Sequence, residues 1–182
     1  KESRELALQS GHYNNAILST SNLGTVAFFS EEYEIASDYF AKSIQLMHES
    51  GDIAGESHVW ILKSFADAEW TDIKTVSDDI KVAIKARTDG TRAYSNMYIV
   101  MGAVRLSLLL DNPTQAATWS GLAEKLGGQN PFVREWLDPL QDKVKSVLTD
   151  TTKLEDLLAS GAELDAETAV NEVAQMLLDN ET

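Results

Sequence analysis

Few residues of this sequence have the types and the spacing that catalysis needs. The three histidines, His12, His48 and His58, lie in different segments and lack the spacing of zinc ligands. The sequence contains no phosphate-binding Gly-rich loop, no His-Glu-x-x-His pair, no Asp-rich calcium loop and no Gly-x-Ser-x-Gly elbow. It has no cysteine, which excludes disulfides, thiolate ligands and a cysteine nucleophile. We therefore expect no enzyme activity, no cofactor and no metal site.

Adjacent carboxylates are the remaining candidates for acid–base chemistry. Glu31 and Glu32 form one such pair, and Asp78 and Asp79 form another. Neighbours on a helix point about 100° apart, so the two carboxylates of a pair do not converge on one substrate. We expect both pairs to be solvated or to complement a helix dipole.

The composition limits the partners. The 182 residues include 15 Lys and Arg against 29 Asp and Glu, which gives a formal net charge of -14. An acidic surface repels phosphate, so we expect neither a nucleic-acid partner nor a membrane partner. The longest apolar stretch, 97–110, is shorter than the ~20 residues that span a bilayer. We expect a cytoplasmic protein with a real core, because 43% of its residues are hydrophobic.

Helical periodicity runs through almost the whole chain, so the expected fold class is all-α with nine to ten helices. Short connections between them predict antiparallel helical hairpins. The chain opens at Lys1 inside an amphipathic pattern, and we expect it to be a fragment of a longer protein. The expected helices are a short one before Gly11, then 15–29, 33–49, 53–69, 72–87, 92–110, 113–127, 131–148, one opening at 152, and 165–178.

Small residues inside the helices recur with a period of about 40 residues. Gly24, Ser64 and Gly102 mark it, and the turns at 51–52, 89–90 and 127–128 follow the same period. Glycine inside a helix costs up to about 1 kcal/mol relative to alanine, so its recurrence indicates close approach of a partner helix. The residues expected to pack within and between the repeats are Leu23, Gly24, Ala36, Phe40, Ser64, Gly102 and Ala116.

Leu23, Gly24, Tyr33, Ala36 and Phe40 have the hallmark spacing of the tetratricopeptide repeat, and the chain resembles that family. The resemblance implies a TPR-like solenoid, a right-handed α-α superhelix of antiparallel hairpins. Residues 1–128 would form about three hairpins, with the first helix left from an upstream repeat. Residues 129–182 would form C-terminal capping helices.

Two later stretches are similar to the C-terminal region of bacterial signal-transduction ATPases of the STAND class, including LuxR-type and maltose-activator-type regulators. They are the Asn-Pro start and paired alanines of 111–124, and the Gly-Ala-Glu run with its capped helix at 161–170. If the chain belongs to such an ATPase, the ATPase domain would lie upstream, since this chain has no P-loop.

The tetratricopeptide resemblance also implies a concave groove lined by the first helix of each pair. Packing between repeats is the alternative for the larger apolar side chains, including Phe28, Phe65 and Leu106. We expect Trp60, Trp70, Trp119 and Trp136 to fill the core or the space between helices rather than to bind a partner, with Trp70, at a helix end, as the first candidate for an exception. The groove positions are Leu18, Ser21, Thr25, Phe28 and Phe29; His58, Ile61, Phe65, Ala68 and Glu69; and Asn96, Ile99, Ala103, Leu106 and Ser107.

These patterns favour a non-catalytic interaction or sensor module of a larger bacterial signalling or transcription-regulatory protein. Its partner would be a protein or peptide in the concave groove, or the upstream domain of the same protein. Two alternatives stay open. One is a small-molecule effector, as for an inducer-binding domain of a STAND-type regulator. The other is a structural or oligomerisation spacer.

Overall fold

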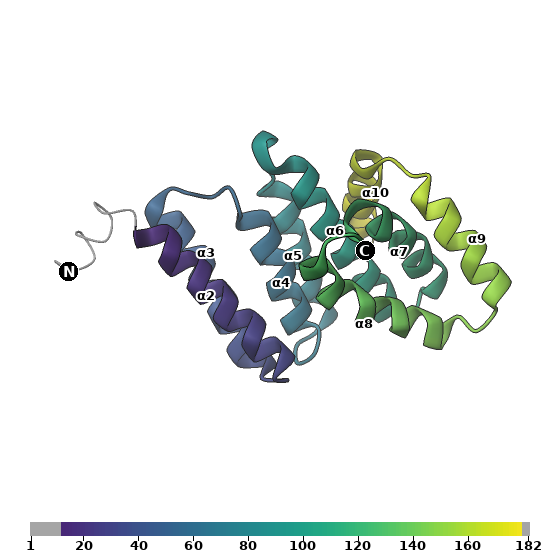
Figure 1. Cartoon of the computed structure of the whole chain (residues 1–182), viewed down its shortest axis with the longest axis horizontal. Coiled ribbons are helices and arrows are strands. Elements are labelled where there is room, and N and C mark those ends of the chain that lie inside the picture. The colour runs from purple at the N-terminus through teal and green to yellow at the C-terminus, as the bar shows by residue number, and fades with distance from the viewer. Residues whose placement is uncertain (1–11, 180–182) are drawn as a thin grey trace. The chain divides into compact units, whose positions relative to one another are not determined.

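The computed structural model describes residues 12–179, and in that range the chain forms helices and no strand (Figure 1). The predicted all-α class is confirmed. The helix expected before Gly11 lies outside the described residues. No described helix combines the length and the apolar character needed to cross a membrane. The helices are α2 His12–Phe29, α3 Tyr33–Ser50, α4 Glu56–Asp67, α5 Ile73–Lys85, the short 3-10 turn η1 Asp89–Thr91, α6 Arg92–Leu109, α7 Pro113–Gly127, α8 Pro131–Val147, α9 Thr151–Ala162 and α10 Ala166–Asp179.

The helices belong to two compact units, one ending at Thr91 and the other beginning at Arg92. The first unit contains α2 to α5 and η1, and the second contains α6 to α10. The expected boundary between repeats and capping helices, at residues 128 and 129, lies inside the second unit and stays a prediction. The superhelical arrangement of the hairpins also stays a prediction.

The second helices of the hairpins repeat with the predicted period. The helices α3, α5 and α7 begin at Tyr33, Ile73 and Pro113, forty residues apart. The loops before α3 and α7 share one backbone conformation, in which Glu31 and Asp111 have φ of 62° and 54°. The residue after each donates its N–H to a carbonyl five residues earlier, at 2.9 and 2.8 Å. The first and third hairpins are therefore repeats in local structure as well as in sequence.

Side-chain caps set most helix starts where the sequence predicts them. Asn112 and Asn130 accept backbone N–H groups at the starts of α7 and α8, each followed by proline. Gly51 ends α3 with a left-handed φ of 76°. The helix expected to begin at residue 53 begins later, because α4 starts at Glu56, after Gly55. Other starts use caps near the expected residue: Asp72 on α5, Asp150 rather than Thr152 on α9, and Asp165 on α10.

The hairpin of α2 and α3 closes around a small residue, as the sequence predicts. The ring of Phe40 lies beside Gly24, and a Cβ atom on that glycine would be only 2.7 Å from the ring. Ser43 also joins the two helices, donating its Oγ–H to the carbonyl of Ile17 at 3.1 Å. Leu23 departs from its predicted packing role, since it is 49% exposed on the outer side of α2. The other six predicted packing residues, Gly24, Ala36, Phe40, Ser64, Gly102 and Ala116, are all buried.

The second unit is built around α7, against which α6, α8 and α9 all pack, while α10 packs on α6. The helices α7 and α9 meet backbone to backbone through a pair of glycines. A Cβ on Gly121 would overlap the carbonyl of Leu158, and a Cβ on Gly161 would overlap that of Thr118. The expectation that neighbouring helices form hairpins is therefore wrong for α8 and α9. The glycines let α9 lie on α7 more closely than a helix with larger side chains could.

The four tryptophans differ in burial. Trp119 and Trp136 are buried in the second unit, Trp60 is half-buried on α4, and Trp70 is 49% exposed in the loop between α4 and α5. Aromatic side chains of this size contribute most when they are removed from water, so the two buried rings are core residues.

Candidate functional site

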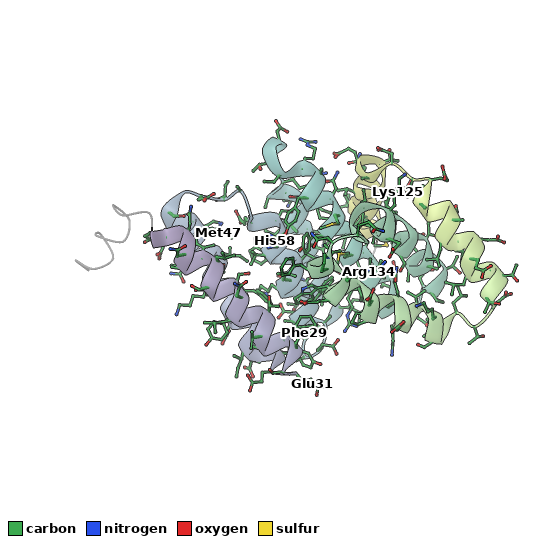
Figure 2. The ribbon with its side chains drawn as sticks, in the orientation of Figure 1. Phe29, Glu31, Met47, His58, Lys125 and Arg134 are labelled. Atoms are coloured by element: carbon green, nitrogen blue, oxygen red, sulfur yellow. The ribbon has the colours of Figure 1, made fainter. Side chains whose placement is uncertain are left out.

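The predicted groove positions differ widely in burial. Phe29 is 47% exposed near the end of α2 (Figure 2). Thr25 is half-buried and Glu69 is exposed. Side chains without accessible surface cannot contact a peptide in this conformation. The predicted groove therefore stays a prediction, and only part of its lining is accessible. The buried positions are Ser21, Ile61, Phe65, Asn96, Ile99, Ala103, Leu106 and Ser107.

Asn96 makes a contact with the C-terminal helix that the sequence analysis did not predict. Its Nδ2 donates to Oε2 of Glu167 at 3.1 Å, and Arg92 Nη1 lies 3.3 Å from the other oxygen of that carboxylate. The contact joins α6 to α10, because the C-terminal helix returns to pack on α6. Asn96 is therefore not available to a groove ligand, which corrects its expected role.

His58 is half-buried on α4, and burial lowers the pKa of its imidazole to about 4 (Figure 2). Desolvation penalises the charged form of a histidine, so the ring is neutral at physiological pH. A neutral ring does not attract an acidic partner, and His58 acts as part of the packing of α4.

The carboxylate pair at 78 and 79 is divided between surface and interior. Asp78 lies on the surface, 2.7 Å from Lys74. Asp79 is buried, and its carboxylate lies 3.1 Å from Nζ of Lys63, which also bonds Asp67 at 2.5 Å. The expectation that Asp79 is solvated is therefore wrong. Adjacent residues point about 100° apart, and on α5 that rotation turns one carboxylate outward and the other toward α4.

The buried group on α4 and α5 titrates near neutral pH. Burial raises the pKa of Asp79 to about 7; Lys63 opposes this shift, and hydrogen bonding with Asp67 adds to it. Burial also acts to raise the pKa of Asp67, but hydrogen bonds, first that from Lys63, hold it below its usual value. Lys63 carries the countercharge, and its two carboxylates outweigh burial and raise its pKa. One lysine thus faces two carboxylates, and the second of them ionises only at about pH 7.

The polar residues of α4 continue this network toward α3. Glu56 accepts hydrogen bonds from His48 Nε2 at 2.8 Å and from Trp60 Nε1 at 3.1 Å. Lys63 lies over the Trp60 ring, 5.7 Å from its centroid. Because 56, 60, 63 and 67 share one face of a helix, they form a continuous stripe that ties α4 to both neighbours. This stripe is a structural link between helices of the first unit.

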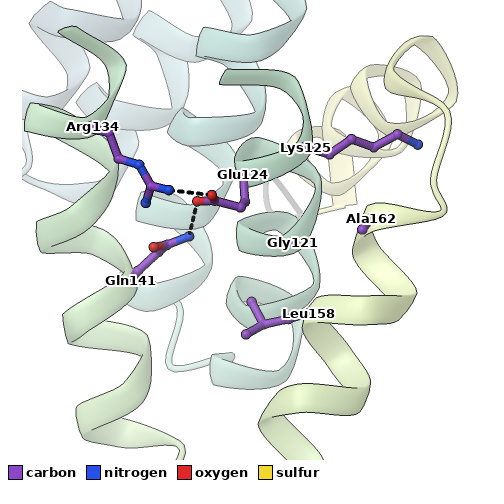
Figure 3. Close-up of a pocket in the computed structure, with 7 residues that line it drawn as sticks. All are labelled: Gly121, Glu124, Lys125, Arg134, Gln141, Leu158 and Ala162. Carbon is purple, nitrogen blue, oxygen red and sulfur yellow. Dashed lines mark hydrogen bonds and ion pairs between the residues drawn. The ribbon is translucent and has the colours of Figure 1, made fainter. Parts of the chain in front are cut away.

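A hollow of about 440 Å³ lies over α7 in the second unit. Its walls are α8 and α9, which both pack on α7 and leave space between them (Figure 3). Figure 3 shows Arg134 and Gln141 on the α8 side, Glu124 on the α7 floor, and Leu158 and Ala162 on the α9 side. This volume falls in the range of about 300–1,000 Å³ that is typical of ligand sites.

The polar groups of the hollow are held in fixed positions by one another. Arg134 Nη2 donates to Oε1 of Glu124 at 2.5 Å, and Gln141 Nε2 donates to Oε2 at 3.2 Å. Arg134 also bonds the carbonyl of Gly128 at 2.7 Å and Asp138 at 2.9 Å. A guanidinium fixed at three points loses little conformational entropy when a ligand binds, so the site is preorganised.

The charges around the hollow balance. Glu124 and Asp138 are negative, and Arg134 and Lys125 are positive. A balanced set does not favour a ligand with net charge of either sign, whereas fixed donors and acceptors beside apolar walls suit an uncharged polar ligand.

The sequence did not predict this site. Glu124 and Arg134 belong to different helices, and their contact depends on the packing of α8 on α7. Gly121 and Glu124 lie in the stretch that resembles the STAND regulators, but nothing in that stretch marked them as site residues. Among residues 12–179, acidic and histidine side chains form no group of three that could hold a metal ion. Comparison with protein families, curated proteins and solved structures found no match.

Proposed function

We propose that this chain is a non-catalytic binding module that takes up a short extended peptide segment of a partner protein in the hollow over α7. The observation that carries the proposal is the preorganised set of Arg134, Glu124 and Gln141 in a hollow of about 440 Å³. The tetratricopeptide and STAND resemblances further support a module within a larger bacterial signalling or transcription-regulatory protein.

The chemistry of the hollow suits a peptide backbone. An extended peptide offers uncharged N–H and C=O groups at regular intervals, together with side chains that need apolar contacts. Gln141 and Arg134 provide polar groups on one wall, while Leu158 and Ala162 provide an apolar wall on the other. A ligand lying between them can satisfy both walls at once.

The test uses a library of N-acetylated tripeptide amides, which carry no terminal charges. The 182-residue chain is incubated with the library, bound peptides are identified by mass spectrometry, and the best peptide is measured by calorimetric titration. Ala162→Phe fills the hollow and is expected to weaken binding at least tenfold. Ala159→Phe is the matched control, since it makes the same change on the exposed side of α9 and should leave the affinity unaltered.

Two results would overturn the peptide proposal. One is a library in which no tripeptide binds with a Kd below about 1 mM, or about -4.1 kcal/mol. The other is a bound peptide whose affinity is the same in both alanine variants. A metabolite that raises the melting temperature of the wild-type chain, with no effect on Ala162→Phe, would instead favour the small-molecule receptor.

A further inference from the structure

The helix α2 contains no Asp, Glu, Lys or Arg. Every other helix among residues 12–179 contains at least one of them. Charged residues make up 24% of the chain, so an 18-residue helix of average composition would hold about four. The chain as a whole carries a net charge of -14 and repels a second copy at long range. Two copies can therefore meet on α2 without bringing like charges of that helix into contact.

The side of α2 that faces away from α3 is exposed and partly apolar. The helix packs on α3 through its opposite side, which includes the buried residues Ile17 and Gly24. On the outer side, Leu18 is 62% exposed and Val26 is 64% exposed. Successive helical residues are about 100° apart, which puts several exposed residues within about 40° of the direction of Asn22. We call them the α2 face: Asn15, Leu18, Asn22, Val26 and Phe29.

The α2 face is self-complementary about Asn22. In an antiparallel pair of α2 helices with a two-fold axis beside Asn22, each residue meets the one that lies equally far beyond Asn22 in the second copy. Leu18 and Val26 both lie one ridge step of four residues from Asn22, so each would face the aliphatic side chain of the other in the second copy. Asn22 would face Asn22 of the second copy. A carboxamide has both donors and an acceptor, so two of them can pair reciprocally.

The charges beyond the end of α2 favour the antiparallel orientation. Glu31, Glu32 and Glu34 follow the helix and are exposed. Parallel helices would bring these acidic groups of the two copies together. Antiparallel helices would hold them about 20–30 Å apart, at opposite ends of the pair. That separation exceeds the Debye length of about 8 Å at physiological salt, so the repulsion between the two groups would be screened.

We propose that the chain forms a homodimer in which the α2 faces of two copies pack antiparallel, with the two-fold axis beside Asn22. The face is about 27 Å long and about 10 Å wide, which is well below the ~800 Å² per partner of a standard interface. The dimer is therefore weak and forms in the micromolar range. This inference does not rest on the proposed function, because the hollow over α7 belongs to the second unit.

Sedimentation velocity of the 182-residue chain tests the dimer. The wild type should pass from monomer to dimer between about 1 and 200 µM. Asn22→Asp and Asn22→Lys each place two like charges at the axis, and each should raise the Kd at least tenfold. An equimolar mixture of these two variants should dimerise at least as tightly as the wild type, because opposite charges then meet. Asn171→Asp is the matched control, since it makes the same change on the exposed side of α10 and should leave the Kd unaltered.

Disulfide trapping tests the orientation, because the chain has no cysteine of its own. Asn22→Cys should give a covalent dimer under mild oxidation, since a disulfide requires Cα atoms within about 7 Å and the two copies of this residue flank the axis. Asn15→Cys changes the same residue type on the same face. In the antiparallel pair its two copies lie about 20 Å apart, so it should stay monomeric.

Three results would overturn the inference. A wild-type chain that stays monomeric up to about 200 µM would leave the α2 face to another partner, such as a groove peptide or a preceding part of a longer protein. A Kd that is the same in Asn22→Asp and the wild type would place the contact elsewhere. Equal trapping of the two cysteine variants would exclude the antiparallel pair. Melting temperatures equal to that of the wild type, as expected at exposed positions, show that the variants are folded.

Discussion

A Cβ atom on Gly24 would lie 2.7 Å from Cε1 of Phe40, because the phenyl ring fills the space beside the α2 backbone. Real Cβ atoms do not approach other carbons so closely, so the two residues are complementary and neither can change alone. This contact fixes how α2 and α3 pack in the first unit.

Gly24→Ala is expected to lower the free energy of unfolding by about 1–3 kcal/mol, measured by urea denaturation. The clash with the phenyl ring outweighs the gain of about 1 kcal/mol that alanine brings to a helix. Gly90→Ala is the control, since a Cβ there meets nothing within 4 Å. Equal effects of the two substitutions would contradict the contact. Adding Phe40→Leu should recover part of the loss, which a double-mutant cycle would detect.

Gly161→Ala should detach α9 from α7, because the new Cβ would overlap the carbonyl of Thr118. Hydrogen exchange of the α9 amides is expected to become much faster, while the amides of α3 keep their protection. Ser160→Ala changes the neighbouring exposed residue and should leave exchange in α9 as it is. Unaltered protection in Gly161→Ala would mean that the two backbones do not meet there.

Phe65 and Phe29 were both predicted to line the concave groove, but only the second is exposed. Phe65→Ala should lower the free energy of unfolding by about 3–5 kcal/mol, as for a core phenylalanine. Phe29→Ala should lower it by about 1 kcal/mol or less, because much of that ring already contacts water. Chemical denaturation of both variants measures the two free energies of unfolding. A small loss of unfolding free energy in Phe65→Ala would contradict the burial of Phe65 and favour its predicted place in the groove lining.

The titration of Asp79 makes one part of the stability depend on pH. Its folded-state pKa of about 7 lies above the ordinary value of 3.8, so the folded state holds a proton that the unfolded state has lost. This contribution is fully present below about pH 4 and is lost as the pH rises to about 7. His58, with its pKa lowered to about 4, acts in the opposite direction between pH 4 and 6.5.

Asp79→Asn separates the two titrations, since it removes the titration of residue 79 and keeps that of His58. The stability of the variant relative to the wild type should therefore be higher at pH 8 than at pH 4.5, by about 3 kcal/mol. The gain arises because the wild type must ionise a buried carboxylate as the pH rises, whereas asparagine stays neutral. Urea denaturation at the two pH values measures it, and a difference that does not vary with pH would contradict the burial of an ionising Asp79. Asp78→Asn, on the surface, is the matched control.

Local signals were enough to predict the helices and their spacing. Each of these signals acts within one helical turn or one hairpin. They are the caps at Asn112 and Asn130, the left-handed Gly51, and the small residues Gly24, Ser64 and Gly102. Short-range hydrogen bonds and close contacts between sequence neighbours determine such features, so the sequence by itself determined an all-α chain with a period of forty residues.

Tertiary packing alone decided the candidate site. Nothing in the helical periodicity of 151–162 says that α9 packs on α7 rather than on α8, because an amphipathic stripe does not name its partner. That packing opened the hollow beside Glu124, and in the first unit the packing of α4 on α5 brought Asp79 to Lys63. Burial and charge pairing depend on which helix surfaces pack together. Contacts between residues far apart in the chain determine that packing, so local sequence patterns do not reveal it.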